Sequence, residues 1–289
     1  MQKRPGFLSK PMPPAPVTLR AQGQVRAGSY ALQAQGAAWK FTLMHDRDED
    51  VLIWLTRGQG RVVVNGVMRG VSMNNALFLP AGTLFAVDVP PGTQALMVRS
   101  PAGLSPRMPH EPLLLRVRDS LAQAELTGTI DAMTRELSQD RALLNEALEA
   151  HVRLIAVWLH RQLRAGAHDP PKETAGQRLV RRYAQEVVRG YQTPRSMGDY
   201  AAMLDVTPTH LTRVCRKFCG RTAADLLTDR KLHAARTALE APKPPVQDIA
   251  RSLGFSSPAY FTRFVLNHTG RTPSDLRAEQ MGVRPARSR

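Results

Sequence analysis

Pro258-Ala259-Tyr260-Phe261-Thr262-Arg263 repeats the pattern of Pro208-Thr209-His210-Leu211-Thr212-Arg213, which lies 50 residues earlier. The correspondence continues, since Gly220-Arg221-Thr222 in the first copy matches Gly270-Arg271-Thr272 in the second. Upstream of these stretches the offset is 49, as between Ala201 and Ala250. The C-terminal part of the chain therefore contains two copies of one unit, and the second copy has one extra residue.

Each copy has the layout of a helix-turn-helix. A short helix rich in small residues, 196–204 or 246–253, precedes a tight turn. The turn ends in a hydroxyl residue, Thr207 or Ser257, which can cap the next helix directly before a proline at its first position. The second helix of each copy has apolar residues at helical spacing, which we expect to face inward: Leu211, Val214, Phe218, Phe261, Phe264 and Val265.

The opposite face of each second helix is the candidate DNA-reading surface. In a major groove, arginine can make bidentate contacts to guanine, and threonine can contact a phosphate, a base edge or a thymine methyl group. Any surface helix has a polar face, but repetition of Thr-Arg at the same place in both copies favours DNA binding. The predicted DNA-binding residues are Pro208, Thr209, Thr212, Arg213, Arg216, Ser257, Pro258, Ala259, Thr262 and Arg263.

Residues 222–240 are predicted to form one long helix between the copies. About 19 residues would span roughly 28 Å. A rigid connector of that length can hold two recognition helices about one duplex turn apart, ~34 Å, on one side of the DNA.

The charge of the chain points to a polyanionic partner. The formal net charge is +16, and residues 170–289 hold 21 Lys+Arg against 10 Asp+Glu. Nucleic acid and an anionic membrane surface both fit this excess, and solubility alone is a further interpretation. No apolar run approaches the ~18 residues of a membrane span. The two cysteines, Cys215 and Cys219, indicate no disulfide framework and fit a reducing cytoplasm.

The front half of the chain reads as short strands separated by Gly and Pro. Residues 38–44 alternate, 51–55 are continuously apolar, and 61–64 lead into Asn65-Gly66, a strong hairpin signal. The pattern predicts a small antiparallel barrel or jelly roll. We expect a helical segment after it, whose apolar stripe either packs on the barrel or also pairs with a second subunit: Leu144, Leu148, Val152, Ile155, Leu159 and Leu163.

The C-terminal motifs resemble those of the AraC/XylS family of bacterial transcription regulators over residues 177–278. The second copy carries the more specific part, namely Ile249-Ala250, Gly254-Phe255, Tyr260-Phe261-Thr262-Arg263-Phe264 and Gly270-Arg271-Thr272-Pro273. The resemblance implies base contacts from Thr209, Thr212 and Arg213 and from Ala259, Thr262 and Arg263.

The chain departs from the family pattern at several positions. Val265-Leu266-Asn267 stands where lysines are usual, Lys231 stands for Arg, and Leu226 and Leu276 stand for Tyr. These changes suggest that the second copy binds phosphates more weakly and makes fewer contacts to bases. Our hypothesis is that the first recognition helix dominates specificity.

The resemblance also implies a cupin-like barrel in front, which would sense an effector and support dimerisation. Phe85 stands where the second cupin motif would place a ligand histidine, and His45 is then more simply a surface residue at a strand end. We therefore expect no metal, no cofactor and no catalytic residue. The barrel aromatics Phe41, Trp54, Phe78 and Phe85 either line an effector cavity or simply fill the barrel. The candidate effector-binding residues are His45, Trp54, Arg57, Arg61 and Phe85.

The expected fold is α+β with two domains, a cupin-like β-barrel with helices and an all-α tandem helix-turn-helix. The expected order is a flexible basic tail (1–27), the barrel (28–110), a helical dimerisation or packing segment (111–166), a linker (167–175), the DNA-binding domain (176–281) and a basic tail (282–289). The predicted function is a cytoplasmic, nucleoid-associated transcription regulator that binds double-stranded DNA as a homodimer, contacts RNA polymerase and responds to a small effector. The alternatives are a cupin-type enzyme with a basic accessory domain and a non-specific nucleic-acid packaging protein.

Overall fold

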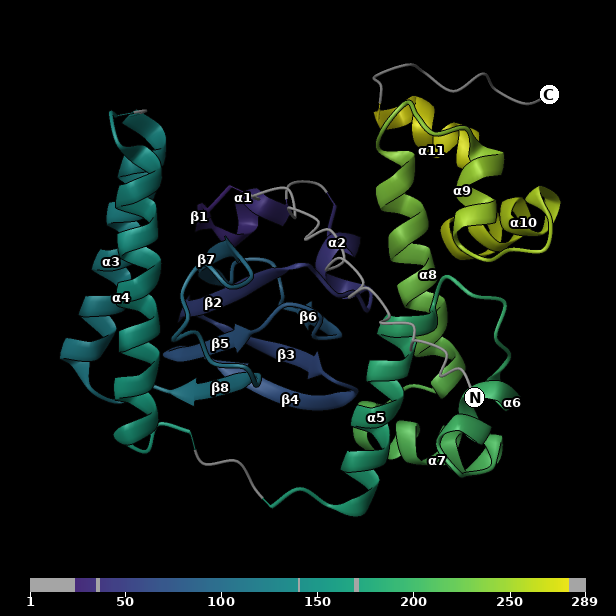
Figure 1. The fold of residues 1–289 in the computed structure, drawn as a ribbon, viewed down its shortest axis with the longest axis horizontal. Coiled ribbons are helices and arrows are strands. Elements are labelled where there is room, and N and C mark those ends of the chain that lie inside the picture. Colours follow the sequence, from purple (N-terminus) through teal and green to yellow (C-terminus); the bar gives the residue numbers. More distant parts are fainter. Residues whose placement is uncertain (1–23, 35–36, 140, 169–171, 281–289) are drawn as a thin grey trace, which may run out of the picture.

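The computed structural model describes residues 24–34, 37–139, 141–168 and 172–280. A barrel of β-strands occupies the middle of the molecule, with two long helices on one side and a helical domain on the other (Figure 1). The expected α+β two-domain architecture is confirmed. The predicted basic tail at 282–289 and most of the predicted tail at 1–27 lie outside the described residues.

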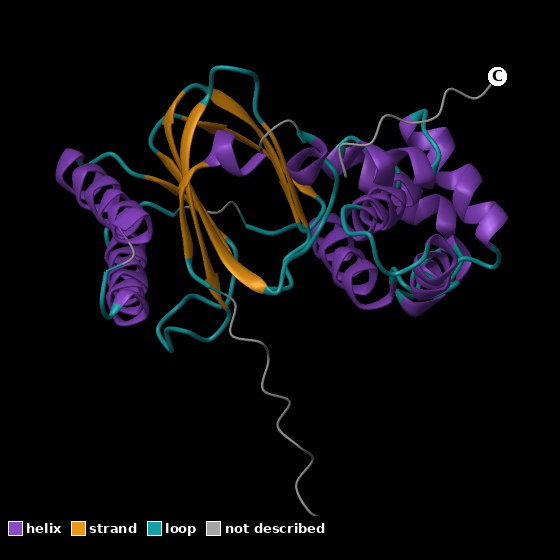
Figure 2. Cartoon of the chain, turned by 90° about the horizontal axis from the view of Figure 1, so that it is seen from above, coloured by secondary structure: helices purple, strands orange, loops and turns teal. Residues whose placement is uncertain are grey.

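The described strands form two antiparallel sheets, with the orders β1-β7-β2-β5-β8 and β4-β3-β6. Figure 2 shows them curving around a common interior. Asn65 and Gly66 have φ of 47° and 74°, so the predicted tight hairpin joins β3 to β4. The strands are β1 (Arg26–Ser29), β2 (Glu49–Arg57), β3 (Gln59–Val64), β4 (Val67–Ser72), β5 (Asn75–Leu79), β6 (Phe85–Asp88), β7 (Gln94–Pro101) and β8 (Leu113–Arg116).

Strand β2 is apolar on both faces, because successive side chains point to opposite sides of a sheet and both sides are covered. Val51, Ile53 and Leu55 belong to the core inside the barrel. Leu52 and Trp54 belong to the core between the sheet and two long helices, α3 (Ser120–Gln139) and α4 (Leu144–Arg164). The helical stripe of α4 therefore packs on the barrel that precedes it.

Three local expectations for the front domain are wrong. Residues 39–42 form a short helix, α2 (Trp39–Thr42), because Trp39 packs against the C-terminal domain while Phe41 enters the barrel. Residues 113–116, expected to be helical, form strand β8 on β5, and their leucines fill the cores on both sides of the sheet. Residues 26–27, expected in the tail, belong to β1 on β7, with α1 (Tyr30–Ala34) after it.

The C-terminal domain is helical throughout its described part. Its first unit shares one hydrophobic core with the barrel, because Val63 and Ala86 on the outer face of the smaller sheet pack with Val180 and Tyr183. The second unit has a separate core around Phe261. The helices are α5 (Ala175–Gly190), α6 (Met197–Met203), α7 (Pro208–Cys219), α8 (Ala223–Leu239), α9 (Val246–Ser252), α10 (Pro258–Thr269) and α11 (Pro273–Gln280).

Candidate nucleic-acid interface

The first helix-turn-helix consists of α6, a short turn and α7. The hydroxyl of Thr207 accepts a hydrogen bond from the backbone N–H of His210 at 3.2 Å, so Thr207 caps α7 as predicted. Leu211 and Val214 are buried in the shared core, whereas Phe218 is half-buried at its edge. Because one side of α7 is fixed inward, its opposite side faces solvent.

The solvent face of α7 gathers the predicted residues at one place. Pro208, Thr209, Thr212, Arg213 and Arg216 line a shallow hollow with a volume of about 410 Å³. Both arginines are exposed. One guanidinium nitrogen of Arg213 donates to Nδ1 of His210 at 3.1 Å, which draws the arginine toward the N-terminal end of the helix. Recognition helices contact base edges mainly with their N-terminal residues, so this orientation suits base readout.

The second helix-turn-helix repeats the arrangement in α9 and α10. The hydroxyl of Ser257 accepts from the backbone N–H of Tyr260 at 3.1 Å, and Phe261 is fully buried. The predicted residues Pro258, Ala259 and Arg263 are exposed and Thr262 is half-buried, with its hydroxyl donating to the carbonyl of Pro258 at 3.0 Å. Phe264, expected to face inward, is only half-buried, because Val265 takes the core position.

Each copy has two repeated arginines, and the two positions have different roles in the structure. Arg221 pairs with Asp229 and Arg271 pairs with Glu279, so this equivalent pair of arginines stabilises each unit from within. Within the described residues, Arg213, Arg216 and Arg263 make no ion pair with a carboxylate. Their guanidinium groups are therefore free to contact an external phosphate or the hydrogen-bond acceptors of a base edge.

Helix α8 joins the two units. It is capped by a reciprocal hydrogen-bond pair between Thr222 and Asp225 and ends at Leu239, close to the predicted range 222–240. Its 17 residues span roughly 25 Å at 1.5 Å each. In Figure 1, α8 runs along the barrel, with α6 and α7 at one end and α9, α10 and α11 at the other.

The structure does not bring the five candidate effector residues together. His45 is fully buried rather than on the surface, because a backbone bridge pairs it with Phe85 and its ring stacks on His233 of α8. Trp54 faces α3, where its indole N–H donates to the hydroxyl of Thr127 at 3.1 Å. Arg57 and Arg61 are exposed, and only Phe85 faces the barrel interior, where it fills the core. The prediction of one cavity lined by these residues is wrong.

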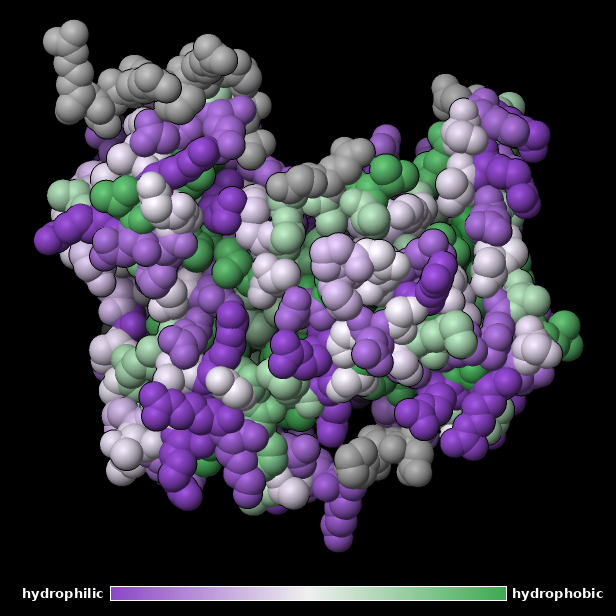
Figure 3. All heavy atoms as spheres, turned by 180° about the vertical axis from the view of Figure 1, so that it is seen from behind, coloured by the Kyte–Doolittle hydropathy of each residue, from purple (hydrophilic) through white to green (hydrophobic). Residues whose placement is uncertain are grey.

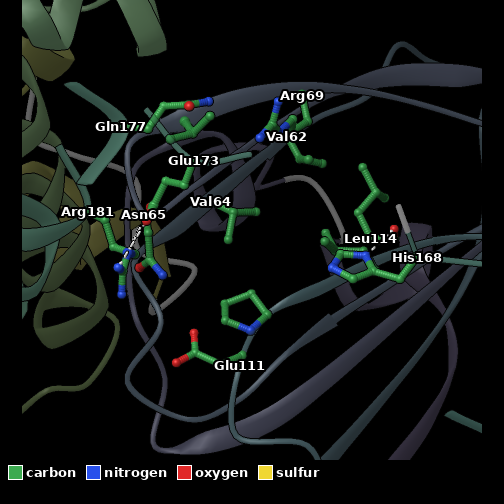
Figure 4. A pocket seen from close by; sticks show the side chains of 13 residues that line it. Val62, Val64, Asn65, Arg69, Glu111, Leu114, His168, Glu173, Gln177 and Arg181 are labelled. Atoms are coloured by element: carbon green, nitrogen blue, oxygen red, sulfur yellow. Dashed lines mark hydrogen bonds and ion pairs between the residues drawn. The ribbon is translucent and has the colours of Figure 1, made fainter. Parts of the chain in front are cut away.

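A cavity with a volume of about 520 Å³ opens instead at the end of the barrel nearest α5. Figure 4 shows Arg69, Glu111 and His168 around it, with the ion-paired Glu173 and Arg181 at one side. The walls are mostly apolar, and the paired guanidinium and carboxylate are 3.0 Å apart. The cavity is lined by Val62, Val64, Asn65, Val67, Arg69, Leu77, Glu111, Pro112, Leu114, His168, Glu173, Gln177 and Arg181.

Two further features of the described residues bear on alternative functions. No three His, Cys, Asp or Glu side chains among them cluster in a way that could hold a metal ion. In the same part of the chain, every helix is too short or too polar to cross a bilayer. Hydrophilic side chains are spread widely over the face of the molecule shown in Figure 3.

A family model described as a helix-turn-helix domain matches residues 200–279. The chain is similar to the probable transcription factor PqrA of Proteus vulgaris, with 37% identity over 68 residues that cover 24% of this chain and 56% of PqrA. It is also similar to the regulatory protein SoxS of Escherichia coli, with 35% identity over 68 residues, 24% of this chain and 64% of SoxS. The chain thus spans less than two thirds of either relative.

Solved structures show weaker similarity. ToxT of Vibrio cholerae with a bound unsaturated fatty acid has a TM-score of 0.44 at 11% identity, covering 93% of this chain and 100% of ToxT. An AraC-type transcriptional regulator of Chromobacterium violaceum has a TM-score of 0.33 at 23% identity, covering 37% of this chain and 96% of that one. The matching family model shows that the C-terminal part of this chain contains a helix-turn-helix domain, and the repeated motifs of that part are similar to those of AraC/XylS DNA-binding domains.

Proposed function

We propose that the whole chain is a transcription regulator that reads two successive major grooves of one duplex with α7 and α10. The observation that carries the proposal is the repeated arginine, Arg213 and Arg263, which is exposed in both units and makes no described ion pair with a carboxylate, while the neighbouring repeated arginine is paired internally. Base readout by both helices would give sequence preference, and contact with RNA polymerase or exclusion of it would turn binding into regulation.

The test is a selection of duplexes from a randomised pool by the full chain, followed by binding titrations at several salt concentrations. We expect enrichment of two short sequence elements about one helical turn apart. The selected duplex should bind at least ~10³-fold more tightly than a random one at physiological salt. A steep salt dependence without any sequence preference would instead identify a packaging protein.

Dimerisation through the outer face of α4 is part of this proposal. Apolar residues recur every three or four positions from Leu143, directly before α4, to Val157, and three of them are exposed: Leu143 at 72%, Leu154 at 56% and Val157 at 37%. Ala147 and Ala150 complete the line and allow close approach of another helix. A second copy of the chain is the natural occupant, since the 3–4 spacing is that of a two-helix seam.

Leu154→Glu is therefore expected to convert the dimer into a monomer, because it places a charge in the centre of this seam. Sedimentation equilibrium of the full chain at micromolar concentration is the measurement. Met73→Glu is the matched control, since Met73 is equally exposed at 55% but lies on a turn of the barrel. A wild-type chain that sediments as a monomer would contradict the proposal.

We also propose that the cavity beside α5 holds the effector. Its apolar wall and Arg69, which has no ion-pair partner in the described residues, suit a small organic molecule that presents a hydrogen-bond acceptor. Gln177 and Arg181 come from the first helix of the DNA-binding domain, so an occupant would touch both domains. A compound that raises the melting temperature of the wild type and of Arg69→Ala equally would bind elsewhere.

A further inference from the structure

From Asp229 to its C-terminal end, helix α8 is held by one segment of the front domain, residues 39–46, which we call the clasp. In the middle of α8, a carboxylate oxygen of Asp229 accepts from the backbone N–H of Met44 at 3.4 Å, and Arg230 pairs with Asp46. Arg230 is only 6% exposed. The clasp therefore contacts the middle of α8 through charged groups that are largely removed from water.

The end of α8 is held by the other end of the clasp. Nζ of Lys40 lies 2.7 Å from a carboxylate oxygen of Glu240, and the guanidinium of Arg236 lies 4.4 Å from the centre of the Trp39 ring. The clasp thus extends from the side of the first helix-turn-helix unit to the side of the second.

Two stacked histidines join the clasp to the middle of α8. The rings of His45 and His233 lie 4.3 Å apart and within 5° of parallel, and Nε2 of His233 donates to the carbonyl oxygen of Lys40 at 3.2 Å. Burial lowers the pKa of His45 and lowers the pKa of His233 to about 3. Both rings are therefore neutral near pH 7, and the stack is free of repulsion between like charges.

The clasp touches elements of both units. Asp229 also pairs with Arg221, in the turn that follows α7. At the other end, Trp39 lines a small hollow together with Leu276 and Glu279 of α11. Because the two units have separate hydrophobic cores, the clasp links parts of the domain that do not share one core.

The opposite side of α8 carries a different contact between the units. Nζ of Lys231 donates to the carbonyl oxygens of Thr193, in the first unit, and Leu253, in the second, at 3.3 and 3.2 Å. Lys231 and His233 are two residues apart, which corresponds to about 200° around a helix. A contact on one side of α8 alone would let the two units rotate about that contact, whereas contacts on both sides prevent this rotation.

We propose that the clasp braces α8 and so fixes the distance and angle between the recognition helices α7 and α10. The inference rests on the proposed function, since it concerns the two sequence elements that those helices read. A braced pair of helices accepts one spacing between the elements, while an unbraced pair tolerates several. Buried ion pairs such as Arg230–Asp46 add little net stability, so the role of this pair in the brace is to define geometry.

The test uses the duplex that the full chain selects from the random pool, with one base pair added or removed between its two elements. Each base pair displaces one element by about 3.4 Å and turns it by roughly a tenth of a turn. The wild type should lose affinity on the order of tenfold on either change, as for one mismatched base pair. The double variant Trp39→Ala, His233→Ala should bind the parent duplex within about threefold of wild type and lose less than about threefold on either change.

Three companion variants make the result specific. His233→Phe keeps an aromatic ring in the stack. This single variant, in which Trp39 is intact, should therefore show the wild-type spacing penalty. Thr237→Ala, on an exposed position of α8, should behave as wild type. Lys40→Ala removes only a half-exposed ion pair, so it should fold normally and reduce the penalty in part, even where the double variant does not fold.

The outcomes separate the brace from the function it serves. An undiminished spacing penalty in Lys40→Ala and in the folded double variant would overturn the brace and leave sequence-specific binding intact. Failure of the wild type to select any sequence would instead remove the proposed function. A reduced penalty with unchanged sequence preference at each element would support both.

Discussion

Alanine in place of Gly254 should destabilise the second helix-turn-helix unit far more than alanine in place of Gly270. Both glycines have a left-handed φ, +71° and +72°, so both substitutions carry the same cost of about 1–2 kcal/mol. The two positions differ in the room that is available for a Cβ atom. A Cβ at Gly254 would lie 2.4 Å from the carbonyl oxygen of Gln192, whereas one at Gly270 meets nothing within 4 Å.

The clash at Gly254 is with backbone atoms, which cannot rotate away. The turn between α9 and α10 therefore has to move away from the loop that precedes α6. We expect a total cost of about 3–5 kcal/mol for Gly254→Ala and about 1–2 kcal/mol for Gly270→Ala. Urea denaturation of the two full-length variants, followed by circular dichroism, measures the difference. Equal losses would mean that the two units are not packed against each other at this turn.

The comparison of Gly254 with Asp205 explains why the same turn position is a glycine in the second copy and an aspartate in the first. The residues are equivalent in the two copies, and Asp205 also has a left-handed φ, 58°. An aspartate tolerates that conformation, but only glycine fits where a second backbone approaches as closely as Gln192 does. The extra demand comes from the packing of one unit on the other, so it is invisible in either copy alone.

The repeat, its caps and its connector could be predicted because they depend on local chemistry. Thr207 and Ser257 each cap the helix that a proline begins, and the helix from Ala223 to Leu239 follows from its capping box and its apolar spacing. Such signals span only a few residues, and they do not depend on which partner the helix meets. The positions of Arg213 and Arg263 on the solvent side followed from the same periodicity.

The clasp and the cavity could not be predicted in this way. The sequence alone gives Asp229, Arg230 and His233 no partner, and only the folded chain shows that residues almost 190 positions earlier cover them. The side on which Trp54 lies was equally undetermined, because strand β2 is apolar on both faces and its alternation gives no preferred direction. The effector prediction failed for that reason.

Replacing Arg213 by alanine should remove more sequence discrimination than replacing Arg263. A bidentate arginine–guanine pair contributes about 1–3 kcal/mol of discrimination against a wrong base. Arg213 is oriented by His210 at 3.1 Å and shares its face with Thr209 and Arg216, which can make further polar contacts. On α10, Tyr260 takes the place of the histidine and packs on Phe255 instead.

The second recognition helix also offers less chemistry beside its arginine. Ala259 and Leu266 can make only apolar contacts, and Leu266 is 41% exposed. We therefore expect Arg213→Ala to lower the preference for the selected base by about tenfold or more, and Arg263→Ala to lower it by about threefold. Binding to single-base variants of the selected duplex measures both, with Arg153→Ala on α4 as a charge-matched control away from the DNA face. If Arg263→Ala caused the larger loss, the second unit would be the main reader, and the orientation of Arg213 by His210 would not matter for recognition.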